Sequence, residues 1–502
     1  MSSQGTTLGS ENGTAESAPA SGRSLKRVIT GVTNGAMTYA CAGITAGIFS
    51  LFAFALESSG PAFFWGWLIV GGSVFLACLN YAELASHFPF AASIYHWPTY
   101  LAGRRAGWWV GWLYLGALLA LLPAYTIVMP AVLGPLFGFT PSRWSIVGIS
   151  VGFIVIGMFL NMLGIDILGR LTVAGVVAEL LVLFVLSLLV YAFGPHNSPS
   201  ILFNTGGTGS TFSAWLPGFL GGGIFVGLWA LFTFETAGTL GEETIDAKRQ
   251  APKAILGAAA LSVIAGAVFL FLIILSIPNL PAAMKSASPI QDTISNSLST
   301  GAAKLYLVVM AWVLFLAINM LFTAISRHIF GMARAAQLPF SSTLSRTRAN
   351  GEPWVAAIVI AVLTSLPLII ITQNLTVLVT GAIAAIYVPY VLVLGITLFA
   401  RLRGWPRSEA PFSLGRWGIP TNLAALVLAI ATLVDLMWPR DTTNPVWKLD
   451  IRVSYWLVGI PLVIGIVYYA LEMHARLAGA RDVTAVESLT DPVVPDEILA
   501  QG

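Results

Sequence analysis

Long apolar runs separated by short polar loops fill most of the 502-residue chain. A helix needs about 20 apolar residues to cross a bilayer, and about twelve stretches reach that length. They lie near residues 32–56, 62–85, 107–136, 144–164, 171–193, 218–241, 254–277, 305–331, 354–373, 376–400, 420–438 and 454–473. Because the loops are short, the pattern predicts an all-α membrane protein in which all these spans form one bundle.

Two of the predicted spans contain small and polar residues where Leu-rich sequence is expected. CAGITAGIF begins at Cys41 in the first span, and FETAGTLGEE begins at Phe234 in the sixth. Gly weakens a helix by roughly 1 kcal/mol relative to Ala. Interrupted segments at corresponding places in two halves are typical of inverted-repeat transporters. We therefore expect a five-plus-five inverted repeat in which helices 1 and 6 are broken.

Composition agrees with a membrane protein, since 57% of the residues are hydrophobic and 9% are charged. Soluble proteins carry roughly 25% charged residues. The net charge of +3 is too small to indicate a nucleic-acid partner, and two cysteines in apolar runs indicate neither a disulfide framework nor a metal site. We expect a disordered tail over 1–27, a transporter domain over 28–475 and a C-terminal tail over 476–502.

The distribution of positive charge predicts the orientation. With the N-terminus inside, the predicted inner loops and tails carry 19 of the 25 Lys and Arg residues. Cytoplasmic loops are enriched in these residues, so we expect both termini in the cytoplasm and an even number of spans. High Ala, Gly and Arg usage with little Lys favours the inner membrane of a bacterium, which is its plasma membrane.

Five stretches resemble one transporter family. They are GIFSLFAFALESSGPAFFWGW from Gly47, YAELASHFP from Tyr81, YHWPTYLAGRRAGWWVGWLYL from Tyr95, TAGTLGEETIDAKRQAPKAI from Thr236 and SRHIFGMARAAQLPF from Ser326. Their order and spacing resemble the amino acid–polyamine–organocation permeases, especially the amino acid/choline transporter branch. The resemblance covers roughly residues 30 to 475. Two loops depart from it: Ala91, Ala92 and Ser93 replace a Gly pair, and Arg334-Ala335-Ala336 replaces Arg-Asp-Gly.

The resemblance implies a secondary active transporter that imports an amino acid or related amine by alternating access. In similar permeases the break in span one holds the substrate carboxylate, and the break in span six faces its amine. A half-helix N-terminus attracts an anion through its free N–H groups. The implied binding residues are Gly43, Ile44, Thr45, Ala46 and Gly47, through the backbone, and Phe234, Glu235, Thr236, Ala237 and Gly238. The alternative is that these glycines only allow close helix packing.

Glu235 and Glu179 are acids at membrane depth, where a carboxylate usually faces a cavity or a partner. Glu235 is predicted to contact the substrate ammonium, with a structural hydrogen bond as the alternative. Glu179 falls where similar proton-coupled permeases have a Lys that occupies the place of a sodium ion. Trp312 to Met320 lacks the hydroxyl ligands of sodium-coupled relatives. Glu179 is therefore the proton-coupling candidate; a structural acid and exchange without a coupling ion are the alternatives.

Glu242, Glu243 and Arg327 are candidates for an inner gate, with a solvated charged face as the alternative. No Gly-Lys pair and no H-E-x-x-H motif occurs, and the five His residues do not cluster, so we expect no enzyme, no cofactor and no metal. The acid and the Gly-rich break together favour a zwitterionic amino acid. Choline, polyamine or ethanolamine transport and uncoupled exchange are the alternatives. The sequence leaves the exact substrate, the direction of transport and the oligomeric state open.

Overall fold

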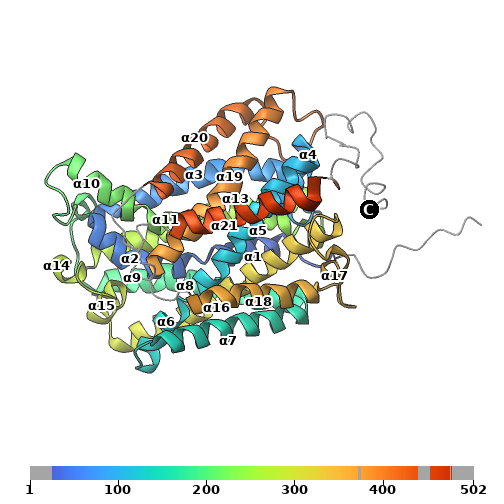
Figure 1. Ribbon diagram of the computed structural model, residues 1–502. Helices are drawn as coiled ribbons and strands as arrows, with labels where there is room; N and C mark the ends of the chain where they lie inside the picture. The colour runs from blue at the N-terminus through green and yellow to red at the C-terminus, as the bar shows by residue number, and fades with distance from the viewer. Residues whose placement is uncertain (1–24, 26, 371–374, 439–452, 475, 477–502) are drawn as a thin grey trace, which may run out of the picture.

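The computed structural model describes residues 25, 27–370, 375–438, 453–474 and 476. Within these residues the chain is a bundle of roughly parallel and antiparallel helices (Figure 1), and the β-structure is a single isolated bridge between Ile29 and Thr244. The predicted tails over 1–27 and 476–502 fall almost entirely outside the described residues, so those two predictions stay predictions.

Among the described residues, eleven helices are long and apolar enough to cross a membrane, and the shorter apolar α18 lies where the sequence predicts the ninth span. In chain order the spans are α1 (Gly31–Ala42) with α2 (Ile44–Ser59); η1 (Pro61–Phe63) with α3 (Phe64–His87); α5 (Arg104–Thr126) with α6 (Met129–Phe137); α7 (Arg143–Leu163); α8 (Ile165–Leu181), η2 (Val182–Leu186) and α9 (Ser187–Phe193); α10 (Phe212–Gly218), η4 (Phe219–Gly223) and α11 (Phe225–Ala230); α13 (Ala247–Leu275); α16 (Thr300–Arg334); α18 (Trp354–Ile370); α19 (Leu375–Leu402); α20 (Gly418–Met437); and α21 (Val453–Tyr468) with η7 (Tyr469–Met473).

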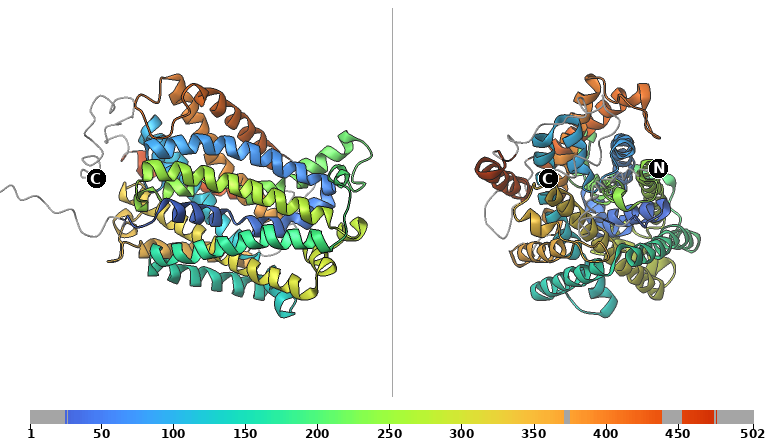
Figure 2. Two further views of the ribbon diagram at one scale, coloured as in Figure 1. Left: turned by 180° about the vertical axis from the view of Figure 1, so that it is seen from behind. Right: turned by 90° about the vertical axis from the view of Figure 1, so that its right-hand side faces the viewer.

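Short elements cover the two ends of the bundle. We name the end where the described chain begins the N-terminal face; α4 (Ser93–Ala102) and α17 (Ser341–Leu344) lie there, and α14 (Leu280–Ala283) and α15 (Pro289–Ser297) lie at the opposite face (Figure 1). The view along the bundle from the N-terminal side shows the spans side by side (Figure 2). The remaining short elements are η3 (Pro199–Phe203), α12 (Thr236–Thr239), η5 (Gly241–Glu243) and η6 (Gly415–Trp417).

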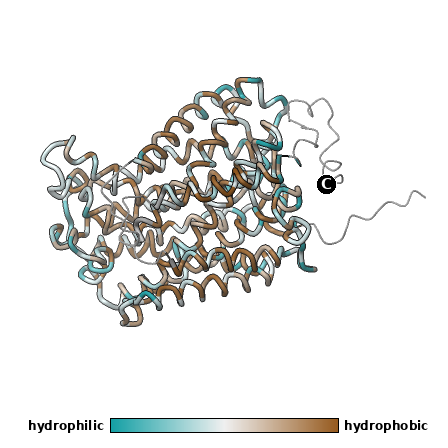
Figure 3. The backbone as a smooth tube through the Cα atoms, viewed as in Figure 1, coloured by the Kyte–Doolittle hydropathy of each residue, from teal (hydrophilic) through white to brown (hydrophobic). Residues whose placement is uncertain are grey.

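Burial separates central spans from peripheral ones. The most apolar window of Arg104–Phe137 is 83% buried and that of Gly31–Ser59 is 78% buried, whereas those of Gly415–Met437 and Tyr455–Met473 are 22% and 11% buried. The peripheral helices stay apolar, and hydrophilic segments gather at the two ends of the bundle (Figure 3). Their exposed faces therefore suit lipid, while spans one and three form the centre.

The packing shows the predicted repeat. Span two packs on span seven (α3 on α13), span one on span six (α2 on α11), span three on span eight (α5 on α16) and span four on span nine (α7 on α18). Each pair is offset by five spans, an odd number, so its members cross the bundle in opposite directions. The all-α fold with a five-plus-five inverted repeat and broken helices 1 and 6 is confirmed.

Candidate functional site

The first span breaks at Gly43. This residue adopts the left-handed conformation, with φ 60° and ψ 51°, between the end of α1 and the start of α2. A Cβ there would lie 3.1 Å from the Cβ of Ala317 and 3.2 Å from a ring carbon of Tyr125. Glycine fits because it tolerates positive φ and because it leaves room for these two neighbours.

The break exposes the C-terminal carbonyls of α1. The Tyr125 hydroxyl on α5 donates to the carbonyl oxygens of Ala42, at 2.9 Å, and Cys41, at 3.2 Å. These carbonyls have no partner within α1 because the helix stops. A phenol from span three therefore satisfies the negative end of this half-helix.

The N-terminus of α2 holds a carboxylate of the protein itself. Both the backbone N–H and the hydroxyl of Thr45 donate to Oε1 of Glu179 on α8, at 3.0 and 2.6 Å. Thr45 is 0% exposed and Glu179 is 1% exposed. The predicted proton-coupling candidate thus lies at the helix end where the sequence predicts the substrate carboxylate.

The sixth span unwinds over residues 231–235. The helix α11 ends at Ala230, α12 begins at Thr236, and Thr233 between them has a φ of 62°. The backbone N–H of Thr233 donates to the Tyr390 hydroxyl on α19 at 3.1 Å. This unwound stretch exposes backbone groups in the middle of the bundle, as expected for a binding site in a discontinuous helix.

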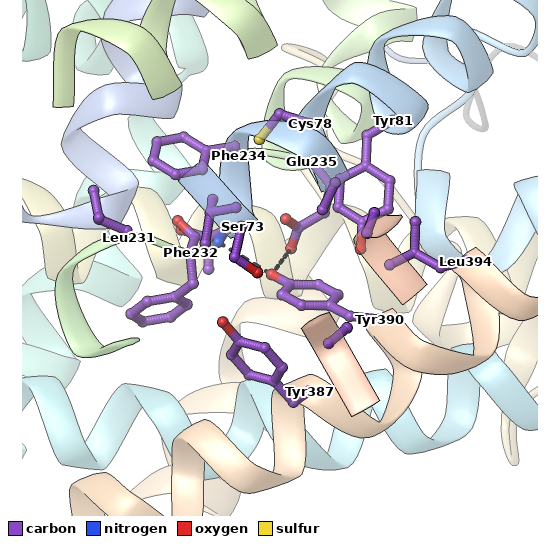
Figure 4. A pocket seen from close by; sticks show the side chains of 15 residues that line it. Ser73, Cys78, Tyr81, Leu231, Phe232, Phe234, Glu235, Tyr387, Tyr390 and Leu394 are labelled. Atoms are coloured by element: carbon purple, nitrogen blue, oxygen red, sulfur yellow. Dashed lines mark hydrogen bonds between the residues drawn. The ribbon is translucent and has the colours of Figure 1, made fainter. Parts of the chain in front are cut away.

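Two phenols hold the Glu235 side chain. The hydroxyls of Tyr114 on α5 and Tyr390 on α19 both donate to Oε1 of Glu235, at 2.5 and 2.7 Å. Glu235 is 1% exposed, and Figure 4 shows its carboxylate directed at Tyr390. The acid is therefore fixed by spans three and ten, and it forms no ion pair in the described part of the chain.

A small cavity of about 30 Å³ lies beside Glu235 (Figure 4), enough for one or two water molecules. Its walls come from α3, the unwound stretch, α19 and α20. Five of its fifteen lining residues are aromatic and one is an acid: Tyr81, Phe232, Phe234, Tyr387 and Tyr390, with Glu235. The cavity is smaller than an amino acid, so these walls must separate before a substrate of that size enters.

The two breaks meet at Cys41 and Thr236, where the Thr236 hydroxyl lies 3.7 Å from the sulfur of Cys41. Phe234 is buried beside the cavity, and its role in covering the site stays a prediction. Asn34 on α1 donates to the carbonyl of Ala237 at 3.1 Å. Spans one and six therefore contact each other on the N-terminal side of the breaks.

Two predicted binding residues instead contact neighbouring helices closely. A Cβ on Gly47 would lie 2.7 Å from the Cβ of Ala230 on α11, and a Cβ on Gly238 would lie 2.7 Å from the Trp97 ring on α4. Small residues at helix interfaces allow such approach in membranes. For Gly47 and Gly238 the geometry matches the packing alternative.

Ion pairs close the N-terminal face around the three gate candidates. Arg327 on α16 donates to Oε2 and Oε1 of Glu243 at 3.1 and 3.0 Å, and it lies 2.7 Å from Oε2 of Glu352. Glu352 also accepts from the backbone N–H of Ile165 at the start of α8. Arg327 therefore ties span eight to the exit of span six and to the loop before span nine.

Glu242 pairs with Arg334 at the end of α16 through two hydrogen bonds. It also accepts from the backbone N–H of Ala91 at 3.0 Å, which joins the loop between spans two and three to span six. Burial raises the pKa of Glu242, but the hydrogen bonds and positive charge of Arg334 outweigh it, so the pKa lies below its ordinary value. Glu242 is therefore ionised at neutral pH.

Sequence reasoning did not identify four of these partners: Tyr114, Tyr125, Tyr390 and Glu352. A phenol inside an apolar span is a weak signal, because Tyr is also common at membrane interfaces. Glu352 stands directly before Pro353 and Trp354, so it resembles an ordinary loop acid. Its contacts with Arg327 and with the backbone N–H of Ile165 distinguish it.

One stretch matches a hydrolase motif. Gly148-Ile149-Ser150-Val151-Gly152 has the G-x-S-x-G spacing, but it lies inside the continuous helix α7. A nucleophile elbow requires a sharp strand-to-helix turn. Ser150 is 0% exposed, and its hydroxyl has no partner among the described residues, so the geometry does not activate it. The described residues also contain no group of three His, Cys, Asp or Glu side chains placed to hold a metal.

Two relatives with similar sequence are named as a transporter and a permease. A protein of Macrophomina phaseolina, named as an amino acid/polyamine transporter, is 26% identical over 420 residues, which cover 78% of this chain and 90% of that protein. Amino-acid permease BAT1 of Arabidopsis thaliana is 24% identical over 482 residues, which cover 86% of this chain and 92% of that protein.

The crystal structure of MhsT in complex with L-phenylalanine matches with a TM-score of 0.56 at 15% identity, over 80% of this chain and 97% of that chain. This likeness shows a shared fold. The sequence model of the amino acid permease family matches residues 29–475, a range that contains every span and both breaks. The chain therefore belongs to the amino acid permease family.

Proposed function

We propose that this permease imports a zwitterionic amino acid by alternating access and that uptake is coupled to protons. The observation that supports it most directly is the pair of breaks, which place Glu235 and the N-terminus of α2 on adjacent segments in the middle of the bundle. An acid suits the ammonium of the substrate, and a helix N-terminus suits its carboxylate. The names of the relatives support an amino acid as substrate.

Glu235 is proposed to bind the ammonium. The phenol hydroxyls of Tyr114 and Tyr390 both donate to Oε1, and Oε2 is proposed to accept from the ligand. The carbonyl groups of the unwound stretch carry partial negative charge and add acceptors. The aromatic walls of the cavity add attraction for a cation.

Alternating access requires that either end can close. At the N-terminal face the Arg327 and Arg334 ion pairs join spans six and eight to neighbouring loops. On the other side of the breaks, the Trp229 indole donates to the Ser50 hydroxyl at 3.1 Å, and its ring packs on Tyr125 with centroids 4.9 Å apart. Both closures bury the region between the breaks, as an occluded transporter requires.

We place the N-terminal face in the cytoplasm and the protein in the plasma membrane. The support is the excess of Lys and Arg in the loops assigned to that side. Glu179 is the proposed proton carrier, because it is a buried acid that bonds directly to the broken span.

A second candidate function is transport of an organic cation such as choline, ethanolamine or a polyamine. It is favoured by one observation: neither Glu179 nor Glu235 forms an ion pair in the described part of the chain, so these two acids have no cation of the protein beside them. Uncoupled exchange is compatible with the same geometry.

The test is uptake into proteoliposomes of labelled neutral and cationic amino acids, γ-aminobutyrate, choline and putrescine. Each substrate is measured with an inward proton gradient, with and without a protonophore, and with and without sodium. We expect a zwitterion to accumulate, the protonophore to abolish accumulation, and sodium to have no effect. Accumulation of choline or putrescine alone would favour the second function. Uptake that occurs only in exchange for substrate preloaded into the vesicles would contradict proton coupling.

A further inference from the structure

The side chain of Glu179 occupies the position that suits a substrate carboxylate. We propose that Glu179 and the carboxylate of the substrate compete for the N-terminus of α2, so that protonation of Glu179 frees this position and one proton binds with each zwitterion. The inference rests on the proposed function, and it specifies how one site couples the two ligands.

The geometry shows that this helix end binds a carboxylate. Thr45 supplies two donors, its N–H and its hydroxyl, and both converge on one oxygen of Glu179 at 3.0 and 2.6 Å. The other free N–H groups of this first turn, those of Ile44 and Ala46, have no hydrogen-bond partner in the described part of the chain. A substrate carboxylate therefore finds there donors of the same kind that Glu179 now uses.

The position accommodates one carboxylate at a time. Thr45 is 0% exposed and Glu179 is 1% exposed, so the side chain fills the space next to the helix end. A Cβ at Gly43, which precedes this turn, would lie 3.1 Å from the Cβ of Ala317 and 3.2 Å from a ring carbon of Tyr125, so little space remains beside the break. Two ionised carboxylates on the same donors would also repel each other. Entry of the substrate carboxylate thus requires that Glu179 leave and lose its charge.

Polar groups around Glu179 suit a neutral acid that has moved away from Thr45. The hydroxyls of Tyr39 on α1 and Tyr306 on α16 are buried and have no hydrogen-bond partner among the described residues. Glu179 lies within electrostatic range of both, and of Tyr125 on α5. These phenols are the titratable groups near Glu179 on the neighbouring helices, and no ion pair in the described part of the chain gives Glu179 a cation. A protonated Glu179 can bond to such hydroxyls without a charged partner.

The competition predicts different behaviour for ligands with and without a carboxylate. A zwitterion must displace Glu179, so its binding takes up a proton wherever free Glu179 is ionised. A carboxylate-free amine binds through Glu235 and leaves Glu179 on Thr45, so it takes up no proton at this position. The coupling is reciprocal, because two ligands linked through one site affect each other equally.

The test measures the Kd of the purified protein for L-alanine and its carboxylate-free counterpart ethylamine, and for γ-aminobutyrate and propylamine, across a pH series. In the wild type we expect the Kd of the zwitterions to rise by up to about tenfold per pH unit in the alkaline part of the series, while the amines show no such slope. Calorimetry in two buffers of different ionisation enthalpy should show uptake of about one proton per zwitterion.

Glu179→Gln mimics the protonated acid. In this variant the Kd of the zwitterions should become independent of pH, and calorimetry should show no proton uptake from the buffer. Asp166→Asn is the matched control, because it removes an exposed acid from the same helix, and it should keep the wild-type slope. If Glu179→Gln does not fold, Thr45→Val removes the hydroxyl donor that Glu179 and the substrate carboxylate share. It should weaken zwitterion binding more at low pH than at high pH, where its loss also weakens the competing Glu179, and it should leave ethylamine binding unchanged.

Three results would each overturn the competition without contradicting the proposed transport function. They are a pH dependence of the zwitterion Kd that persists in Glu179→Gln, an equal pH dependence for ethylamine and L-alanine, and unchanged zwitterion binding in Thr45→Val. A wild type that binds and transports none of the zwitterions would overturn the proposed function first, and this inference with it.

Discussion

Arg327 forms a two-bond ion pair with Glu243, from its Nε to Oε2 at 3.1 Å and from its Nη2 to Oε1 at 3.0 Å. Both side chains are buried, so this pair is shielded from solvent. It joins the long helix of span eight to the segment that leaves the broken span six. The same guanidinium contacts Glu352, so one side chain holds three segments at the N-terminal face.

Arg327→Ala should open this face. The substitution leaves two buried carboxylates, Glu243 and Glu352, without their cation, which costs about 3 kcal/mol or more. The native Cys41 at the end of α1 is 0% exposed and reports opening. In a Cys78→Ala background, which leaves Cys41 as the remaining cysteine, we expect maleimide to modify Cys41 several times faster in the Arg327→Ala protein.

Arg327→Lys keeps the charge and serves as the control, with labelling between the two extremes because a lysine cannot bond both oxygens in parallel. Equal labelling rates in all three proteins would show that the ion pair does not close this face.

The Glu242–Arg334 pair should depend on pH in an acid window. The pKa of Glu242 is lowered, so its ionised form stabilises the fold above the ordinary carboxyl pKa, and this contribution disappears as the pH falls through the lowered value. Each side chain is 17% exposed, so we expect only about 1 kcal/mol.

The measurement is the difference in Tm between the wild type and Glu242→Gln in detergent. It should be constant at neutral pH and shrink below about pH 4. A difference that instead changes around neutral pH would contradict the assigned pKa direction.

The hydrogen bonds from Tyr114 and Tyr390 to Glu235 should strengthen substrate binding. Tyr114→Phe and Tyr390→Phe each remove one hydrogen bond to Glu235, which costs about 1 to 3 kcal/mol for a bond to a charged group. We expect each to weaken substrate affinity in uptake assays by roughly tenfold or more.

Tyr387→Phe is the matched control, since Tyr387 lines the same cavity but is not one of the two phenols that donate a hydrogen bond to Glu235. If the three variants behaved alike, the phenol–carboxylate bonds would have no specific role in binding.

Gly47→Ala should destabilise the contact between spans one and six. The added Cβ would lie 2.7 Å from the Cβ and 2.9 Å from the Cα of Ala230, and a backbone atom cannot move aside as a side chain can. Overpacking of this kind costs about 1 to 3 kcal/mol. Gly152→Ala on α7, where nothing lies within 4 Å, should leave the Tm unchanged or raise it. A normal Tm for Gly47→Ala would mean that the two helices separate readily.

Glycine substitutions in the two loops that depart from the family pattern should stabilise the protein. Ala92 and Ala336 have φ values of 58° and 56°, a region that favours glycine, and they stand where similar permeases have Gly. Ala92→Gly and Ala336→Gly should each raise stability by about 1 kcal/mol, measured as an increase in Tm. Ala91→Gly is the control, because Ala91 does not have a positive φ, and it should lower the Tm or leave it unchanged. A decrease in both test variants would show that the alanine side chains contribute packing that outweighs the strain.

The sequence by itself determined the spans and the location of the breaks. Apolar runs of membrane length must become helices in lipid, because every backbone group needs a partner there. The Gly43 break follows from CAGITAGIF, since Gly tolerates the left-handed backbone that ends a helix. These features depend on residues close together in the chain, so periodicity and composition suffice to predict them.

Only the tertiary structure decided which groups meet at the breaks. Glu179 is 134 residues from Thr45, and Tyr114 and Tyr390 are 121 and 155 residues from Glu235. Which face of each helix turns inward, and at what height, depends on how the spans pack against one another, and hydropathy along one span does not record it. For this reason the sequence predicted two important acids, whereas their partners became evident only when the helices were assembled.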